Sequence, residues 1–308
     1  MTTVQDFAQP LLDFVAPIHF WPLNVGVQIT AIALPCLLLS ETFNFSAGRW
    51  VFKPLASFGF IIAALSYIPT NDATAFAASS TSAVTSFSTC ADLTNAIPST
   101  VDGLLGLATA YAAELKHIVF GVAPTILSGV PATSSMAGAV HTTYTKAMLL
   151  AFVLGWLGDV LLIPRRGFLP GLASFLAGHA AFMVAFTFHG QDNVAHQKGL
   201  AFIVTMAAIV GPWLLPKIKN KIMRGAVIAY MLVISGMVLT AFGSINCGED
   251  YLPERILGAL MFFFSDLFVA RQEFVHKTVL NKWIGLPLYY IAQLLLASTL
   301  RGQHVLTN

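Results

Sequence analysis

The sequence predicts an all-α membrane protein, a single domain over residues 1–308 that forms a polytopic bundle of about eight transmembrane helices. Three observations predict this class. Hydrophobic residues make up 56% of the chain, charged residues make up 10% against about 25% in soluble proteins, and the mean hydropathy is +0.76. A soluble globule could not keep so much apolar surface in water, which excludes a cytosolic enzyme, a disordered protein and a secreted disulfide scaffold. A net charge of +2 without a basic stripe also excludes a nucleic-acid-binding protein.

Eight stretches of the chain are long and apolar enough to cross a bilayer, whose core of roughly 30 Å requires about 20 helical residues. A helix also satisfies its own backbone hydrogen bonds, as the hydrocarbon requires. The predicted spans are residues 23–40, 54–70, 146–164, 168–188, 199–216, 222–243, 255–271 and 283–300.

Charged or turn-forming residues between the spans justify these boundaries. The first span is expected to remain in the membrane, because Asp6 and Asp13 occupy the place of a signal peptide's basic region. Lys53 opens the second span at one membrane face. The segment 165–167, Arg-Arg-Gly, separates the third span from the fourth, and the lysine-rich segment 217–221 separates the fifth from the sixth.

A long insert, residues 71–145, separates the second span from the third. Residues 73–100 are rich in Ala, Ser and Thr, which is typical of a flexible loop. Residues 101–130 are apolar but carry Glu114 and Lys116 in their middle. We therefore expect this segment to form an interfacial helix rather than a ninth span.

The distribution of basic residues predicts the orientation of the bundle. With the N-terminus outside, the cytosolic face holds eleven basic residues, namely Arg49, Lys53, Arg165, Arg166, Lys217, Lys219, Lys221, Arg224, Arg271, Lys277 and Lys282. The other face holds five, namely Lys116, Lys146, Lys198, Arg255 and Arg301. In this topology Cys90 and Cys247 share the non-cytosolic side, where they form either a disulfide or two free thiols.

Two acidic residues lie inside predicted spans, Asp159 and Asp266. Charged groups in a span are costly and therefore suggest a function. Each follows a small residue, Gly158 or Ser265, which allows another helix or a substrate to approach closely. By the predicted topology both lie about five residues from the cytosolic end of their helix, roughly 7–8 Å. The alternative is a pair of buried acids that merely bond neighbouring helices.

Further polar residues are expected at a similar depth and could contribute to a site. These are Lys53, His179, Arg271, Tyr289, Tyr290 and Gln293. Gln293 follows Tyr290 by three residues and can share its helix face. The other five have simpler interpretations: His179 as a core residue, the tyrosines as part of an interfacial aromatic belt, and the two cations as markers of the cytosolic face. A metal site at His189, Asp192 and His196 is a weak hypothesis, and the sequence contains no HExxH, CxxC or GxSxG motif.

Several of these residues together resemble the YhhN-type membrane family. The resemblance rests on Gly158-Asp159, on Phe175, Gly178-His179 and Phe182, on Ser265-Asp266, on the segment 289–295 (Tyr-Tyr-Ile-Ala-Gln-Leu-Leu), and on Lys53-Pro54-Leu55. It covers most of residues 20–70 and 146–300. That family includes the lysoplasmalogenases, multi-pass enzymes that hydrolyse the vinyl ether bond of lysoplasmalogens. The resemblance implies a lysophospholipid substrate and, in a eukaryote, the endoplasmic reticulum membrane.

Two carboxyl groups in different environments suit that reaction. A vinyl ether is hydrolysed by protonation of carbon, which gives an oxocarbenium-like cation that water then attacks. One carboxyl group can donate the proton while an ionised one activates water, the division of labour that glycosidases use. The hypothesis assigns this pair to Asp159 and Asp266, the phosphate to Lys53 or Arg271, and the orientation of glycerol or water to Tyr290 and Gln293. It requires no metal or organic cofactor.

Three other classes of membrane protein are compatible with intramembrane acids. A proton-coupled transporter uses them near mid-bilayer, whereas these two are expected off centre. An intramembrane aspartyl protease would have glycine where Trp156 stands. A catalytically inactive protein that binds lysolipids is the third alternative.

Overall fold

The computed structural model describes residues 24–68, 134–164, 166–188, 191–244 and 252–301, and these residues form helices without strands. Eight helices are long: α2 (Val25–Thr42), α3 (Ser46–Tyr67), α7 (Ser134–Leu161), α8 (Phe168–Thr187), α9 (Asn193–Leu214), α10 (Lys221–Gly243), α11 (Leu252–Ala270) and α12 (Val279–Ser298). Two short elements follow α9 and α11, the 3₁₀ turn η1 (Leu215–Lys217) and the π-helical turn η2 (Arg271–Val275). The prediction of a polytopic helical membrane bundle is confirmed.

Among the described residues, seven of these helices are long and apolar enough to cross a membrane. The eighth, α11, departs from the rest because it carries Glu254, Arg255 and Asp266 in an otherwise apolar sequence. It packs mainly against α12 and also against α10. Its charged side chains therefore face protein rather than lipid, as intramembrane charges usually do.

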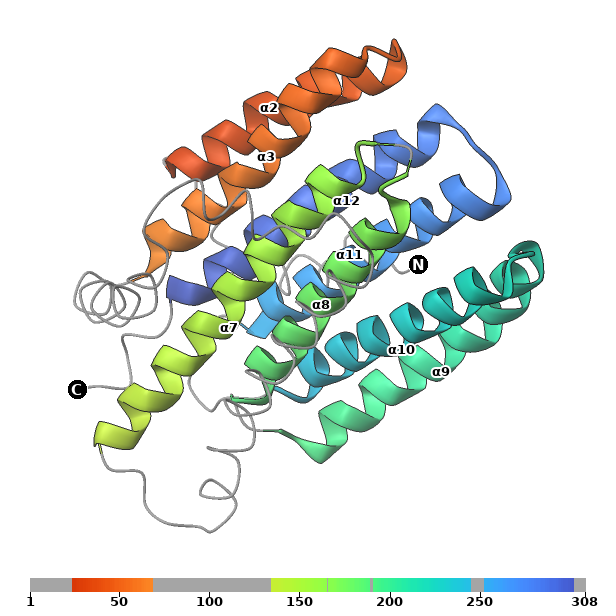
Figure 1. Ribbon diagram of the computed structural model, residues 1–308. Helices are drawn as coiled ribbons and strands as arrows, with labels where there is room; N and C mark the ends of the chain where they lie inside the picture. The colour runs from red at the N-terminus through yellow and green to blue at the C-terminus, as the bar shows by residue number, and fades with distance from the viewer. Residues whose placement is uncertain (1–23, 69–133, 165, 189–190, 245–251, 302–308) are drawn as a thin grey trace, which may run out of the picture.

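Consecutive helices run in alternating directions through the bundle (Figure 1). The turns after α2, α7, α9 and α11 all lie at the same end of the molecule. The main packing pairs are α2 with α3, α7 with α8, and α11 with α12, and α3 bridges α7 and α12. This end carries Arg49, Lys217, Lys219 and Lys277, so the basic residues gather where the predicted topology requires them.

Several helices begin before their predicted apolar spans, and α3 and α7 do so by the largest margin. Helix α3 begins at Ser46 instead of residue 54, so Lys53 lies about two turns inside the helix and Pro54 is internal. Proline is tolerated in membrane helices because neighbouring groups satisfy the freed backbone carbonyl. Helix α7 begins at Ser134, within the predicted insert 71–145, because helix formation continues past the apolar stretch. The segment 101–130, Cys90 and Cys247 lie outside the described residues.

Helices α2 and α3 approach so closely that their contact depends on two glycines. A Cβ atom placed on Gly59 would lie 2.2 Å from the Thr30 hydroxyl oxygen and 2.7 Å from the Gly26 carbonyl oxygen. Thr30 in turn donates a hydrogen bond from its hydroxyl to the Ala56 carbonyl, at 3.0 Å. Small residues at such a contact allow membrane helices to pack backbone against backbone.

Replacing Gly59 with leucine should therefore destabilise the bundle by about 1–3 kcal/mol, the usual effect of overpacking a well-packed contact. The thermal unfolding midpoint in detergent would show the loss. Gly225→Leu is the matched control, because a Cβ atom there meets no atom within 4 Å. Equal midpoints for the two variants would contradict the close contact of α2 with α3.

Candidate active site

Asp159 lies near the C-terminal end of α7 and is almost completely buried, with 2% of its surface exposed. Two side chains of α3 bind its carboxylate. The Lys53 ammonium nitrogen is 3.2 Å from Oδ1, and the Ser57 hydroxyl donates a 2.5 Å hydrogen bond to Oδ2. Lys53 and Ser57 are one helical turn apart, so both reach the same carboxylate. An ammonium partner in a buried site is the arrangement expected of an ionised carboxylate.

Helix α12 supplies a second layer around Asp159. The Tyr289 side chain is within hydrogen-bonding reach of the carboxylate. It also accepts a 3.3 Å hydrogen bond from the Gln293 amide nitrogen. The Tyr290 hydroxyl oxygen lies 3.3 Å from the Ser57 hydroxyl oxygen. All three α12 side chains are buried; Tyr289 lines the cavity beside Asp159, and Tyr290 and Gln293 pack behind that lining.

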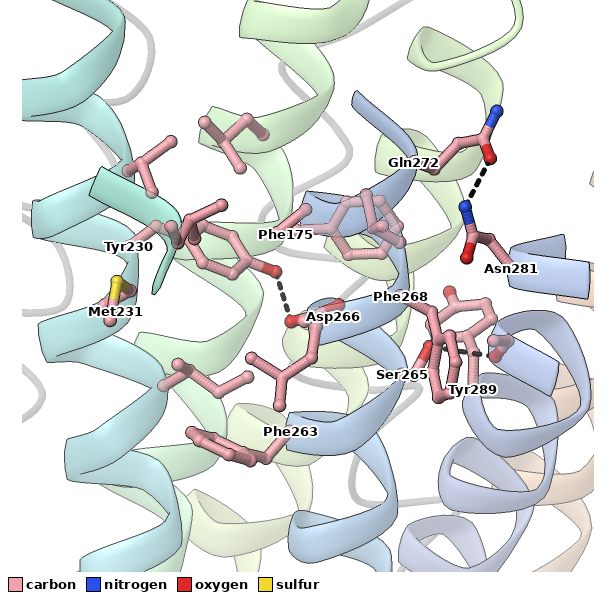
Figure 2. A pocket seen from close by; sticks show the side chains of 18 of the residues that line it. Phe175, Tyr230, Met231, Phe263, Ser265, Asp266, Phe268, Gln272, Asn281 and Tyr289 are labelled. Atoms are coloured by element: carbon pink, nitrogen blue, oxygen red, sulfur yellow. Dashed lines mark hydrogen bonds between the residues drawn. The ribbon is translucent and has the colours of Figure 1, made fainter. Parts of the chain in front are cut away.

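Asp266 lies on α11 and has different partners. The Tyr230 hydroxyl of α10 donates a 2.7 Å hydrogen bond to Oδ2, as Figure 2 shows. The His179 Nε2 atom of α8 lies 3.1 Å from the same oxygen and 2.8 Å from the Tyr230 hydroxyl oxygen. The Asp266 side chain is 17% exposed, whereas that of His179 is 1% exposed. Asp266 therefore sits in a hydrogen-bonded cluster with Tyr230 and His179.

One cavity of about 190 Å³ is lined by both carboxylates. Its wall is mostly apolar, and α9 and α10 contribute Ile203, Met206, Val210, Leu214, Val227 and Met231. Its polar lining includes Lys53, Asp159, Tyr230, Ser265, Asp266, Gln272, Asn281, Lys282 and Tyr289. Figure 2 shows Tyr230 and Met231 on one side of the cavity, Gln272 and Asn281 on the other, and Asp266 between them. The cavity is thus amphipathic, with two buried acids in its wall.

Small residues beside each acid bring the neighbouring helices close, as the sequence predicted. A Cβ atom on Gly158 would lie 2.8 Å from the ring of Phe175 on α8. On α11, the Ser265 hydroxyl donates a 2.9 Å hydrogen bond to the Gly285 carbonyl of α12. These contacts fix the rotation of α7 and α11, and hence the direction in which each carboxylate points.

The predicted site residues divide into three groups. Lys53, Asp159, Asp266 and Tyr289 line the cavity. His179, Tyr290 and Gln293 lie behind it, in contact with those that do. Arg271 is not a lining residue: its guanidinium donates hydrogen bonds to the side chains of Asn281 and Thr278.

Sequence reasoning missed Ser57, Tyr230 and Lys282. Tyr230 is the one tyrosine in an apolar helix (residues 221–243), which is a weak signal for burial with a partner. Ser57 follows Lys53 by one turn, and that spacing predicts a shared face. Nothing in the local sequence distinguishes Lys282 from the other lysines at this end.

Asp192, in the polar segment before α9, has a structural role. This residue caps α9, and its carboxylate accepts a 2.7 Å hydrogen bond from the Ala195 amide, as N-cap aspartates do. Within the described part of the chain, no three His, Cys, Asp or Glu side chains are grouped to hold a metal ion. His189, the third member of the hypothetical metal site, lies outside the described residues.

Comparison with known proteins places these helices in a family. The chain is 30% identical over 165 residues to lysoplasmalogenase TMEM86B of Homo sapiens, covering 52% of this chain and 66% of that protein. It is 26% identical over 191 residues to the lysoplasmalogenase homolog of Dictyostelium discoideum, covering 51% of this chain and 63% of that protein. The matches span slightly less than two thirds of these relatives. No solved structure shows significant similarity. The model of the YhhN family matches residues 118–300, which is more than half of the chain and includes both acids, so the protein belongs to the YhhN family.

Proposed function

We propose that this protein is a membrane hydrolase that cleaves the vinyl ether bond of lysoplasmalogens, with ethanolamine or choline head groups, to a fatty aldehyde and a glycerophospho-alcohol. The observation that carries the proposal is the single amphipathic cavity lined by Asp159 and Asp266. Relatives named lysoplasmalogenase support the choice of substrate. The apolar wall from α9 and α10 suits an alkenyl chain, and the acids lie where that wall meets polar side chains.

The two carboxyl groups take different roles because their partners differ. Asp159 faces the Lys53 ammonium and the Ser57 hydroxyl, which stabilise a carboxylate. Asp266 has no lysine or arginine partner in the part of the chain that the structure describes; it shares hydrogen bonds with the Tyr230 hydroxyl and the His179 imidazole, so no ammonium charge favours its carboxylate form. The proposal therefore assigns proton donation to Asp266 and activation of water to Asp159.

The reaction then proceeds in two stages. The Asp266 carboxyl group gives its proton to the vinyl carbon remote from oxygen; the π electrons form the new C–H bond, and positive charge develops on the adjacent carbon and the ether oxygen. A water molecule adds to that carbon while the Asp159 carboxylate accepts its proton. The hemiacetal C–O bond then breaks: the glycerol oxygen takes the proton held by Asp159, the hemiacetal hydroxyl gives its proton to the Asp266 carboxylate, and an aldehyde is released with both acids restored. Overall, one water is consumed and no electron is lost or gained.

Purified protein in detergent tests the proposal directly. Lysoplasmenyl-ethanolamine and lysoplasmenyl-choline should each yield fatty aldehyde, detected by a coupled aldehyde dehydrogenase or by mass spectrometry. A lysolipid with a saturated ether in place of the vinyl ether should yield none, because it cannot be protonated at carbon. Tight lysolipid binding without aldehyde release would contradict the proposal and favour a lysolipid-binding protein. Proton flux in liposomes that depends on a transported solute would favour a proton-coupled transporter.

Tyr230→Phe should lower the turnover number roughly tenfold or more, with little change in KM. The substitution removes one hydrogen bond to Asp266 that stabilises the carboxylate formed as the proton leaves, and a hydrogen bond to a charged group contributes about 1.5–3 kcal/mol. Steady-state aldehyde release against substrate concentration measures both constants. Phe also fits the hydrophobic surroundings of Tyr230, so the fold should persist. An unchanged turnover number would exclude Tyr230 from positioning Asp266.

A further inference from the structure

The cavity has a charged side chain at its polar end that neither the proposed reaction nor the family match assigns. Lys282, in the first turns of α12, lines the cavity, and its side chain is 28% exposed. The other lining lysine, Lys53, is 12% exposed and is paired with Asp159. Arg271 is occupied by Asn281 and Thr278. Among the described residues, Lys282 is therefore the cavity cation that solvent or a ligand can best reach.

Lys282 forms a polar cluster with residues of α2 and α3. Its ammonium nitrogen donates a 2.6 Å hydrogen bond to a carboxylate oxygen of Glu41, and an Arg49 guanidinium nitrogen lies 3.7 Å from the same oxygen. One acid and two bases give the cluster a net charge of +1. The Glu41 side chain is 11% exposed; it does not itself line the cavity and lies next to it through its contact with Lys282. The positive end of the α12 dipole adds to the attraction for an anion here.

We propose that Lys282 and Glu41 form the subsite for a zwitterionic phospholipid head group, in which Lys282 binds the phosphate and Glu41 binds the ammonium group of ethanolamine or choline. This inference rests on the proposed function, because it assigns the head group of the proposed substrate. A phosphate of one negative charge matches the +1 cluster, and the head-group cation then takes the place of one basic partner of Glu41. Asn281 lines the cavity next to Lys282 and adds a polar side chain to this part of its wall.

The spacing along α12 agrees with this placement. Lys282 precedes Tyr289 by about two helical turns, or roughly 10 Å along the axis. Tyr289 lies beside Asp159 and lines the same cavity as Lys282. The glycerol backbone that joins a vinyl ether to a phosphate is several bonds long and covers much of this separation. The lipid would thus lie with its phosphate at Lys282, its vinyl ether at the two acids and its chain against α9 and α10.

Binding of an uncleavable lipid tests the subsite separately from catalysis. The probe is a saturated alkyl-lysophosphoethanolamine, whose dissociation constant is measured with full-length protein in detergent. Lys282→Gln should weaken its binding about tenfold and leave binding of the corresponding 1-alkylglycerol, which lacks phosphate, unchanged. Glu41→Gln should weaken binding of the ethanolamine lipid but strengthen binding of alkyl-lysophosphatidate, which has no ammonium group. Lys221→Gln, an exposed lysine outside the cavity, is the control.

Each outcome separates this subsite from the proposed reaction. Unchanged phospholipid binding by Lys282→Gln would overturn the subsite, even if the wild type releases aldehyde. The expected binding pattern without aldehyde release would support the subsite and overturn the reaction. Displacement of the ether lipid by millimolar inorganic phosphate alone would indicate a site for free anions and overturn the lipid assignment. Equal losses for phospholipid and alkylglycerol would show a general packing defect and likewise overturn it.

Discussion

Asp159→Asn and Asp266→Asn should each reduce aldehyde release by at least about a hundredfold. Positioned general acids and bases contribute about 10²–10⁴-fold to rate, and an amide can neither donate a carboxyl proton nor accept one from water. The two losses should be far from additive, because both carboxyl groups act in one reaction. The measurement is the turnover number for lysoplasmenyl-ethanolamine, normalised to folded protein by gel filtration.

The controls separate chemistry from folding. Asp192→Asn makes the same chemical change at the α9 cap, outside the cavity, and asparagine caps a helix as well as aspartate does, so its turnover should equal that of the wild type. Asp266→Asn keeps a side chain of the same shape beside the Tyr230 hydroxyl and the His179 imidazole, so the variant should fold normally. Near-normal turnover of folded Asp266→Asn would remove Asp266 from the mechanism.

The fold follows largely from features that are local in the sequence. Apolar length sets the number and place of the helices, and short charged segments such as 217–221 set the turns. The predicted starts of α3 and α7 were wrong. These helices begin at Ser46 and Ser134, before their apolar stretches, because polar residues at a membrane surface can be helical although their hydropathy does not mark them as part of a span. Helix α11 was recognisable as a membrane span despite its charges, because the phenylalanine-rich segment around Asp266 is apolar.

The site was predictable as a set of residues but not as a set of pairs. Asp159 and Asp266 stand out because an intramembrane acid is rare. That Lys53 binds Asp159, more than a hundred residues away, depends on how α3 lies against α7. Likewise, Tyr230 reaches Asp266 through the contact of α10 with α11. The rotation of each helix about its axis determines which side chains pair. That rotation is set by contacts between helices, such as Gly158 with Phe175, and these contacts cannot be recognised in a single sequence.

Lys53→Met should destabilise the protein by about 3–5 kcal/mol, because it leaves the buried Asp159 carboxylate without its counter-charge. Methionine keeps an unbranched chain of similar length, so packing changes little. Unfolding by added dodecyl sulfate in mild detergent measures the loss. Lys221→Met, at an exposed lysine, is the control and should leave the free energy of unfolding within about 0.5 kcal/mol of the wild type.

The double variant Lys53→Met/Asp159→Asn decides whether the pair acts as an ion pair. Replacing both charges removes the uncompensated group, so most of the lost stability should return, as it often does when both members of a buried ion pair are replaced. Aldehyde release should stay at the low level of Asp159→Asn, because the base is still absent. A stable but inactive double variant therefore shows that inactivity comes from lost chemistry rather than misfolding. Strictly additive stability losses would mean that the two charges do not interact.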